Sequence, residues 1–254
     1  MGVGTYVVVA IVLILLVLFF KRMFMKKHDL TKGEVSAQKE TSIDAIALEQ
    51  SKNADTNFCY SVWIYVNDWN YRYGENKIIF IRGTDDKPCP KVELDKTQNN
   101  LNVTMAIHPG SNSGPKLGDV LDKVSHKVSG SDAHQTQTHS CTVNNIPIQK
   151  WVNILVTGRG RTVDIYLDGK LVRTCLLPGV PVINSGSPVK LTPDGGFAGE
   201  TNRFQFWPEA CSPQKAWDIY AAGKGGGGPL DAIGKIKVKM SLTDGGKVMD
   251  SVSI

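Results

Sequence analysis

Alternation of apolar and polar residues marks one stretch of this chain more clearly than any other. Residues 151–175 read WVNILVTGRGRTVDIYLDGKLVRTC, and their apolar positions alternate on both sides of two turn signals, at 159–161 and at Asp168 and Gly169. A period of two is typical of half-buried strands, and an Asp-Gly pair tolerates the positive φ angles of a two-residue type I′ turn. No crossover helix fits between these strands. The pattern therefore predicts an antiparallel three-stranded meander in a mainly β protein.

Further strands are predicted on both sides of the meander. Residues 58–66 read FCYSVWIYV, and this density of β-branched and aromatic residues is typical of a central strand that is buried on both faces. Shorter apolar patterns predict strands at 77–82, 91–94, 101–107, 138–143, 189–191 and 197–207. A polar stretch from His108 to Thr138 interrupts this series, and loops of that length inside a domain are often functional.

One short helix is predicted after the last of these strands. Ser212 supplies a capping hydroxyl, Pro213 suits the first helical position, and Gly223 is typical of the residue that follows a helix end. The helix has a single apolar stripe, formed by Ala216, Ile219 and Tyr220. We therefore expect it to lie across a sheet edge or across the end of a β-sandwich.

The N-terminal residues 1–20 contain no charged side chain. At about 1.5 Å per residue, a helix over this stretch is roughly 30 Å long, which is enough to cross a bilayer. The alternative is a cleaved signal peptide, which requires basic residues before the apolar core and a small-residue cleavage site after it. The chain shows neither feature, so a retained transmembrane anchor in contact with membrane lipid is expected. The anchor residues are Tyr6, Val7, Ile11, Leu13, Leu15, Leu18 and Phe20.

Basic residues follow the apolar stretch directly. They are Lys21, Arg22, Lys26 and Lys27. An excess of Lys and Arg is typical of cytoplasmic flanks, so the pattern predicts a single-pass membrane protein with its C-terminal part on the cytoplasmic side. The glycosylation sequon at Asn102 would then be modified only if the topology were reversed.

Charge and cysteine usage exclude some classes of function. The formal net charge is +5, and the four basic residues after the apolar stretch supply most of it. No basic stripe with interleaved aromatic residues occurs elsewhere, so no nucleic-acid partner is expected. The five cysteines are widely spaced and include no C-x-x-C pair, which indicates neither a disulfide framework nor a zinc site. Free and mostly buried thiols are expected.

Four regions follow from these patterns. Residues 1–27 are the transmembrane anchor with its basic segment, 28–56 are a polar stalk, 57–223 are the folded domain, and 224–254 are a glycine hinge with a β tail. The tail contains one amphipathic strand with only the remaining tail to pair with, and its apolar positions are Ile236, Val238, Met240 and Leu242. Because a lone strand is not stable in water, it either docks on its own domain or adds to a neighbouring subunit by β-augmentation.

Three blocks of sequence carry a resemblance to a known family. They are FCYSVWIYV near the start of the domain, IPIQKWVNILV followed by VDIYLDGKLV, and GGFAGETNRFQFW followed by ACSPQKAWDIY. In this order they resemble the concanavalin A-like (laminin G-like) domain over about 57–223. The resemblance implies a mainly β fold, an antiparallel two-sheet jelly-roll sandwich with a short C-terminal helix. It also implies that Trp151, Trp207 and Trp217 occupy core positions.

A narrower resemblance concerns the string WIYVNDWNYRYGENKIIF together with the single N-terminal anchor. The combination is similar to the version of this domain in structural proteins of large icosahedral DNA viruses of algae and amoebae. It implies a non-enzymatic minor capsid protein that tethers the inner membrane of a virion to its capsid shell. Its partners would be other capsid or membrane proteins, and its domain would lie between the inner membrane and the capsid.

Enzymatic activity is not expected from the acidic residues. Glycoside hydrolases of this superfamily need two carboxylates that face each other across a sugar, about 5 to 5.5 Å apart in retaining enzymes. The nearest arrangement here is Glu93 and Asp95, and no further acid follows at the required spacing.

Carbohydrate binding without catalysis is the alternative function. Lectins of this fold use loop carboxylates, amides and an aromatic platform, in some cases with calcium held by oxygen ligands. The candidate contacts to a glycan or another partner are Asp68, Trp69, Asn70, Tyr71, Tyr73 and Asp194. The competing interpretation is that Trp69 and Tyr71 cover an end of the sandwich and that Asp194 belongs to a turn. No cofactor is expected for the main interpretation, and the lectin alternative allows calcium. The histidines lack the spacing of a zinc site.

Overall fold

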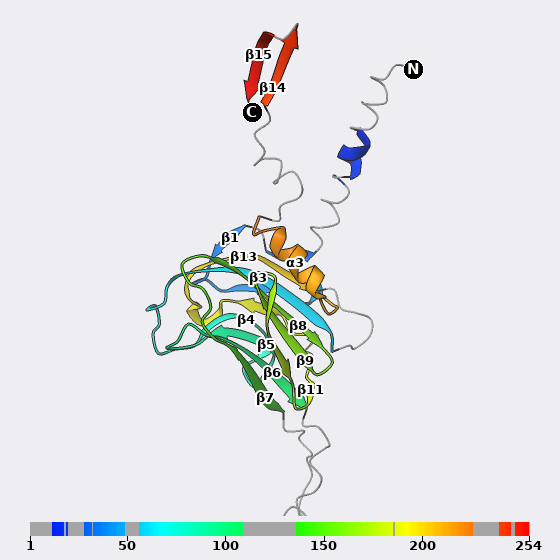
Figure 1. Ribbon diagram of the computed structural model, residues 1–254. Helices are drawn as coiled ribbons and strands as arrows, with labels where there is room; N and C mark the ends of the chain where they lie inside the picture. Colours follow the sequence, from blue (N-terminus) through cyan, green and yellow to red (C-terminus); the bar gives the residue numbers. More distant parts are fainter. Residues whose placement is uncertain are drawn as a thin grey trace, which may run out of the picture. The chain divides into compact units, whose positions relative to one another are not determined.

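The computed structural model describes residues 12–17, 19, 28–31, 33–48, 56–108, 136–184, 186–225, 239–244 and 247–253 (Figure 1). The chain divides into two compact units. The larger unit is Asp29–Ala221, and the other combines Met1–His28 with Ala222–Ile254. The long polar loop predicted between His108 and Thr138 lies outside the described residues, apart from its two ends.

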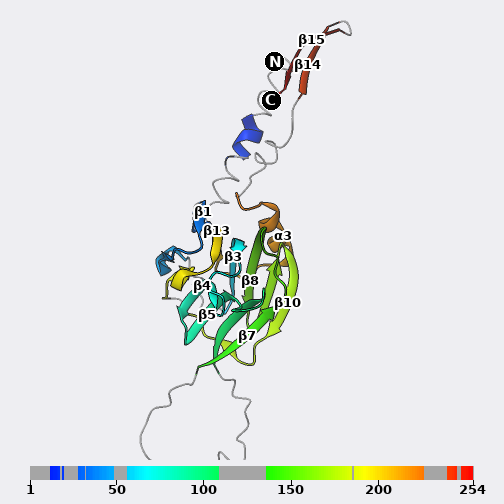
Figure 2. The same ribbon diagram turned by 90° about the vertical axis from the view of Figure 1, so that its left-hand side faces the viewer.

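The larger unit is a sandwich of two antiparallel sheets (Figures 1 and 2). The first sheet, here called sheet A, has the strand order β1 (Glu34–Ser36), β13 (Ala198–Trp207), β3 (Phe58–Asp68), β8 (Trp151–Arg159), β9 (Thr162–Leu167) and β10 (Lys170–Leu176). The second, sheet B, has the order β11 (Val180–Pro181), β6 (Leu101–His108), β5 (Lys87–Leu94), β4 (Lys77–Thr84), β12 (Val189–Leu191) and β2 (Thr41–Ile43). Strand β7 (Gln137–Val143) also pairs with β6. This confirms the predicted mainly β two-sheet sandwich.

The strands predicted between residues 58 and 207 are all present, and several extend by a few residues beyond the predicted ends. The meander of β8, β9 and β10 is confirmed, with antiparallel pairing between consecutive strands. Asp168 and Gly169 both have positive φ angles, 50° and 73°, as a type I′ turn requires. These turns and strands depend on local sequence, which is why the period of two located them.

The hydrophobic core lies between the two sheets. Because side chains alternate along a strand, even-numbered residues of β3, such as Tyr60 and Val62, point into the core, and odd-numbered residues point outward. Aromatic rings fill the centre, and Tyr60 lies 4.9 Å from Phe206 between ring centroids. The hydroxyl of Tyr60 accepts a hydrogen bond of 3.0 Å from Arg82 Nη1, so this buried polar group has a partner.

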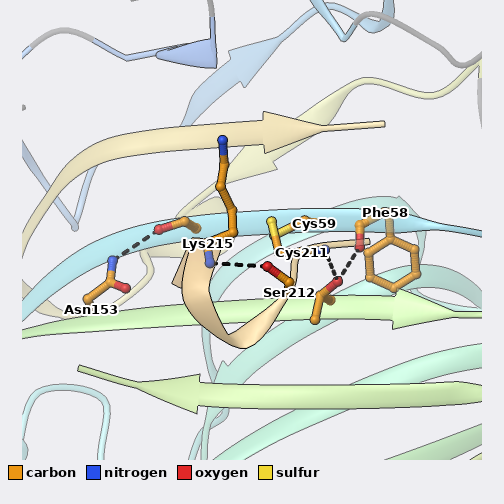
Figure 3. The surroundings of a disulfide bond; sticks show 8 residues. Phe58, Cys59, Asn153, Cys211, Ser212 and Lys215 are labelled. Carbon is orange, nitrogen blue, oxygen red and sulfur yellow. Dashed lines mark hydrogen bonds between the residues drawn. A yellow bond between two sulfur atoms is a disulfide. The ribbon is translucent and has the colours of Figure 1, made fainter. Parts of the chain in front are cut away.

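Helix α3 (Pro213–Ala221) covers part of the outer face of sheet A (Figures 1 and 2). Ala216 and Ile219 of the helix pack in a second apolar cluster, with Cys59, Leu155, Tyr166, Trp207 and Cys211. The predicted cap is confirmed, because the backbone N–H of Lys215 donates to Ser212 Oγ at 3.2 Å (Figure 3). The predicted place at a sheet edge or sandwich end is wrong, since these apolar partners belong to four strands of one face. Trp217, expected in the core, is 46% exposed.

The expectation of free thiols is wrong for four of the five cysteines. Cys59 in β3 is joined to Cys211, two residues before the start of α3 (Figure 3), and Cys141 in β7 is joined to Cys175 in β10. The first bond holds the helix segment on sheet A, and the second joins the two sheets. Spacing gave no indication of either bond, because the paired cysteines are 152 and 34 residues apart in sequence.

Cys89 is the remaining cysteine, and its thiol is free and buried. Burial raises the pKa of this thiol to about 12, because the thiolate is poorly solvated in the core. We expect the native protein to resist alkylation by iodoacetamide at pH 8 without reductant, and one thiol per chain to react after unfolding in urea. Mass spectrometry of the alkylated protein measures both. Rapid labelling of Cys89 in the folded protein would contradict the buried position.

The segment predicted as a polar stalk is not a stalk over its described part. Residues Glu34–Ser36 form β1 at the edge of sheet A, and Thr41–Ile43 form β2 at the edge of sheet B. A short 3₁₀ helix, η2 (Ala45–Ala47), follows, and Leu48 is buried. The polar composition concealed these strands because each has three residues and lies at an edge, where one side faces solvent.

The predicted N-terminal anchor falls largely outside the described residues. Residues 12–17 are helical and include Leu13 and Leu15. No helix within the described ranges has both the length and the apolar character that crossing a membrane requires. The other predicted anchor and basic residues are not described, namely Tyr6, Val7, Ile11, Leu18, Phe20, Lys21, Arg22, Lys26 and Lys27. The anchor stays a prediction.

The C-terminal segment of the smaller unit contains a two-stranded antiparallel hairpin. Its strands are β14 (Lys239–Asp244), which includes Met240 and Leu242, and β15 (Lys247–Ser253). The predicted strand thus pairs with the tail itself, while Ile236 and Val238 lie outside the described residues. Because an isolated two-stranded hairpin is marginally stable, addition to a neighbouring sheet stays a prediction.

Candidate functional site

The structure brings together the two segments in which sequence analysis placed candidate contacts. Tyr71, in the loop after β3, donates a hydrogen bond from its hydroxyl to the carbonyl oxygen of Gly195 at 3.2 Å. Arg72 Nη1 donates to the carbonyl oxygen of Asp194, and its guanidinium also pairs with Glu75 at 2.7 Å. The loop and the 194–195 turn therefore bind each other.

Other candidates in this loop also have structural partners. Asp68 Oδ1 accepts the backbone N–H of Asn70 at 2.9 Å, which closes a local turn. Trp69 packs against the core, and the ammonium of Lys77 lies 5.2 Å from the centroid of its ring. Tyr73 differs, because its side chain is 62% exposed. The polar groups of this loop serve mainly to fix its shape.

The turn that follows β12 includes the 3₁₀ helix η3 (Pro193–Gly195). Thr192 and Asp194 have positive φ angles of 47° and 54°, and the hydroxyl of Thr192 donates to the carbonyl oxygen of Lys39 at 2.8 Å. Asp194 is therefore part of a tight turn. Within the described residues, no group of three or more His, Cys, Asp or Glu side chains is arranged to hold a metal ion.

Replacing Tyr71 with Phe is expected to lower the free energy of unfolding by about 1 kcal/mol, because the hydrogen bond to Gly195 is lost while the ring remains. Chemical denaturation of both proteins measures the difference. If this loop only supports the fold, ligand affinity in the variant stays unchanged. A loss of affinity without a loss of stability would instead make Tyr71 a direct ligand contact.

A groove of about 380 Å³ lies on the outer face of sheet A. It is lined by Gln38, Tyr65, Asn67, Trp151, Ala198, Gly199 and Glu200. Tyr65 and Asn67 belong to the outward-facing positions of β3, two residues apart, because inward positions of this strand alternate with them. Asn67 precedes the loop of Asp68, so the groove adjoins the predicted region without coinciding with it.

Strand register places three of the groove residues in one row across sheet A, together with Ser36 of β1. Ser36 of β1 is paired with Glu200 of β13, Glu200 with Tyr65 of β3, and Tyr65 with Trp151 of β8. Directly paired residues of neighbouring strands share a face of the sheet. With strands about 4.8 Å apart, the row extends for about 14 Å. Gln38 reaches the groove from the turn after β1.

A glycine allows β13 to approach β3 closely beside the groove. A Cβ atom added to Gly199 would lie 1.9 Å from the carbonyl oxygen of Tyr65, so no larger residue fits without a shift of the backbone. The register between β13 and β3 also changes between Ala198 and Gly199, which indicates a bulge. Gly199 is paired with core-facing Val66, so the missing Cβ allows the backbones of β13 and β3 to approach each other at this end of the groove.

The chemistry of the groove combines aromatic rings with polar groups. The rings of Tyr65 and Trp151 are half-buried, with centroids 5.7 Å apart and planes at 49°. Asn67, Gln38 and Glu200 are exposed and supply amide donors and acceptors and one carboxylate. A few polar groups beside an apolar surface suit a ligand that has hydroxyl groups at its rim and an apolar face.

The acidic pair considered for hydrolysis is engaged elsewhere. Glu93 is buried, and its Oε2 lies 3.4 Å from the ammonium of Lys91. Asp95 Oδ1 accepts the backbone N–H groups of Thr97 and Gln98 at 2.9 and 3.0 Å, and these hydrogen bonds lower the pKa of Asp95. Neither residue lines the groove.

Sequence analysis missed most of the groove. Alternation along β3 was sufficient to put Tyr65 and Asn67 on one outward face, but it did not identify what lies beside them. Glu200 and Gln38 reach the site only through the pairing of β1 with β13, and β1 lies in the segment predicted as a stalk.

Comparison with known families gives a match over most of this unit. The family model Laminin_G_3, described as concanavalin A-like lectin/glucanases superfamily, matches residues 40–216. This range contains six of the seven groove residues, all except Gln38. No curated protein matches the sequence significantly.

Several solved structures are similar to this chain at low identity. A crystal structure of a mutant of HCR/D has a TM-score of 0.50 and 10% identity, covering 74% of this chain and 41% of that chain. The binding domain of botulinum neurotoxin serotype G has a TM-score of 0.46 and 13% identity, over 76% and 46%. A type C neurotoxin structure, whose cell entry is stated to depend on two ganglioside molecules, has a TM-score of 0.45 and 16% identity, over 65% and 36%. This chain spans less than half the length of these structures.

Proposed function

This chain belongs to the concanavalin A-like lectin/glucanases superfamily, and we propose that its sandwich acts as a non-enzymatic carbohydrate-binding module. The observation that carries the proposal is the groove on sheet A, where the rings of Tyr65 and Trp151 lie beside the side chains of Asn67, Gln38 and Glu200. Aromatic rings present apolar surface to one face of a sugar ring, and the amide and carboxylate groups accept or supply hydrogen bonds to its hydroxyls.

Binding without turnover is proposed because the carboxylates in and near the groove do not form a hydrolytic pair. Glu200 is the single acidic residue among the described groove residues. Hydrolysis with retention needs two carboxylates about 5 to 5.5 Å apart, and inversion needs a second carboxylate at a longer distance. Glu93 forms an ion pair with Lys91, and Asp95 accepts hydrogen bonds from the backbone of the turn that follows it.

The experiment is a binding assay with a panel of immobilised glycans. Full-length protein is kept in a detergent without a sugar headgroup, because such a headgroup would compete for the groove. We expect binding to a subset of the glycans, competition by the same free glycan, and an unchanged glycan mass after incubation. Folded protein that binds no glycan in the panel would overturn the proposal, and cleavage of a bound glycan would overturn its non-enzymatic part.

The proposal puts the sandwich on the extracellular or lumenal side of a membrane. The disulfides Cys59–Cys211 and Cys141–Cys175 support this side, because disulfides persist in oxidising compartments and are rare in the cytosol. The basic residues after the apolar stretch predict the opposite, cytoplasmic side. Insertion into microsomes distinguishes the two. Glycosylation at Asn102, absent in Asn102→Gln, with protection from protease supports the lumenal side, and an unmodified, digested domain supports the cytoplasmic side.

A second candidate function is structural. In it, the protein is a minor capsid protein that tethers the inner membrane of a virion to its shell. The uncharged stretch 1–20 and the resemblance of residues 63–80 to viral structural proteins support this candidate. The hairpin of β14 and β15 would then join a neighbouring subunit by β-augmentation. Deletion of residues 225–254 is expected to leave the sandwich folded and to weaken assembly, as measured by the yield of particles. Loss of folding on deletion would contradict this role of the hairpin.

A further inference from the structure

We propose, resting on the glycan-binding function proposed above, that the groove accepts neutral glycans and discriminates against sialylated or sulfated ones. The inference concerns the class of ligand. It follows from the negative charge of Glu200. The strand register places this residue in the same outward-facing row as Tyr65 and Trp151.

Glu200 is the single charged side chain among the described residues that line the groove. It is exposed, and it lies between Ser36 on one side and Tyr65 on the other, next to the aromatic rings. A ligand that rests on Tyr65 and Trp151 therefore lies beside a carboxylate.

No basic side chain among the described groove residues offsets this negative charge. Lys150 precedes Trp151, but its ammonium lies 3.6 Å from Asp168 Oδ2, where its charge is already paired. Lys39 follows Gln38 and does not line the groove. An acidic sugar would have to bring its charge close to Glu200 without a cation to compensate it.

A neutral sugar makes use of the same carboxylate. The two oxygens of Glu200 are acceptors only, and they suit hydroxyl groups, which are donors. Hydrogen bonds to a charged acceptor are stronger than those between neutral groups. The amides of Asn67 and Gln38 each provide a donor and an acceptor, so they match a neutral polyhydroxyl ligand without requiring a charge on it.

Coulomb's law sets the size of the effect. Two like charges about 4 Å apart in water repel enough to weaken binding by about fivefold, and partial exclusion of water by the ligand increases the factor. We therefore expect wild-type protein to bind a neutral glycan at least about fivefold more tightly than the same glycan with a terminal sialic acid or sulfate. Because Glu200 is exposed, this preference is expected to decrease as salt is added.

The test uses pairs of glycans that are identical except for one sialic acid or sulfate. Binding of each member to full-length protein is measured for the wild type, Glu200→Gln and Glu200→Lys. Glu200→Gln is expected to bring the ratio of the two affinities close to one, and Glu200→Lys to invert it. Glu209→Gln is the matched control, because Glu209 is also exposed but lies outside the groove, and it is expected to keep the wild-type ratio.

The outcomes separate this inference from the proposed function. If wild-type protein binds glycans but prefers the acidic member of each pair, or if the ratio is the same in all the variants, the inference is overturned and the proposed function stands. If folded wild-type protein binds neither member of any pair and no other glycan, the proposed function fails and the inference fails with it.

Discussion

Replacing Cys59 and Cys211 with serine is expected to lower the free energy of unfolding by about 4 to 5 kcal/mol. The bond closes a loop of 152 residues, and the loss of chain entropy in the unfolded state increases with loop length. Helix α3 has nine residues and is too short to be stable alone, so it depends on this attachment and on its apolar contacts with sheet A. Urea denaturation of the oxidised proteins without reductant measures the change.

The second disulfide provides the matched comparison. Cys141 and Cys175 are 34 residues apart, so their replacement with serine is expected to cost about 1 kcal/mol less than loss of the longer loop. Reductant should lower the stability of the wild type and have little effect on a variant in which all four cysteines are replaced. If wild-type stability is the same with and without reductant, the two bonds do not form in the protein.

Replacing Trp151 with Ala is expected to weaken glycan binding by about 30- to 100-fold. Large aromatic residues at the centre of a binding site commonly contribute 2 kcal/mol or more, and Trp151 supplies the larger ring of the groove. The change also removes the ring partner of Tyr65, which lies 5.7 Å away between centroids. Isothermal titration of the full-length protein with the glycan that binds most tightly measures the loss.

Trp217→Ala is the control for this substitution. Trp217 is also a partly exposed tryptophan, but it lies on α3 against Tyr220 and outside the groove. We expect its replacement to leave the affinity within about twofold of the wild type. An equal loss of affinity in both variants, or urea midpoints that fall together with affinity, would attribute the effect of Trp151→Ala to the fold instead of the groove.

Most of the sandwich was predictable because its signals are local. The period of two in 58–66 and the Asp168–Gly169 turn each depend on neighbouring residues, and the structure confirms the strands and the turn. The capping hydroxyl of Ser212, followed by Pro213 at the first helical position, likewise located the start of α3. The apolar stripe of the helix shows that one side of the helix is buried. It does not show which part of the sandwich covers that side, and the helix was therefore wrongly placed at a sheet edge or sandwich end.

The groove and the disulfides were not predictable in the same way, because they depend on pairing between distant segments. Glu200 lies beside Tyr65 only in the register that follows the bulge at Ala198 and Gly199. Ser36 and Gln38 reach the same face only because a three-residue strand from a polar segment adds to β13. Alternation shows which residues share a face of one strand, but not which strands are neighbours.

The position of β1 has a mechanical consequence for a protein held at its N-terminal side. This strand has three residues and a single neighbour, β13, and the turn that follows it carries Gln38, which lines the groove. A pull on Asp29 directed away from the sheet would first break the contacts of Asp29 with Gln205 and Arg203 of β13. It would then peel β1 off before it strained the longer strands, because the few hydrogen bonds of an edge strand break one after another. The affinity of the groove for a ligand should then decrease under tension. The ligand would dissociate before the sandwich unfolds.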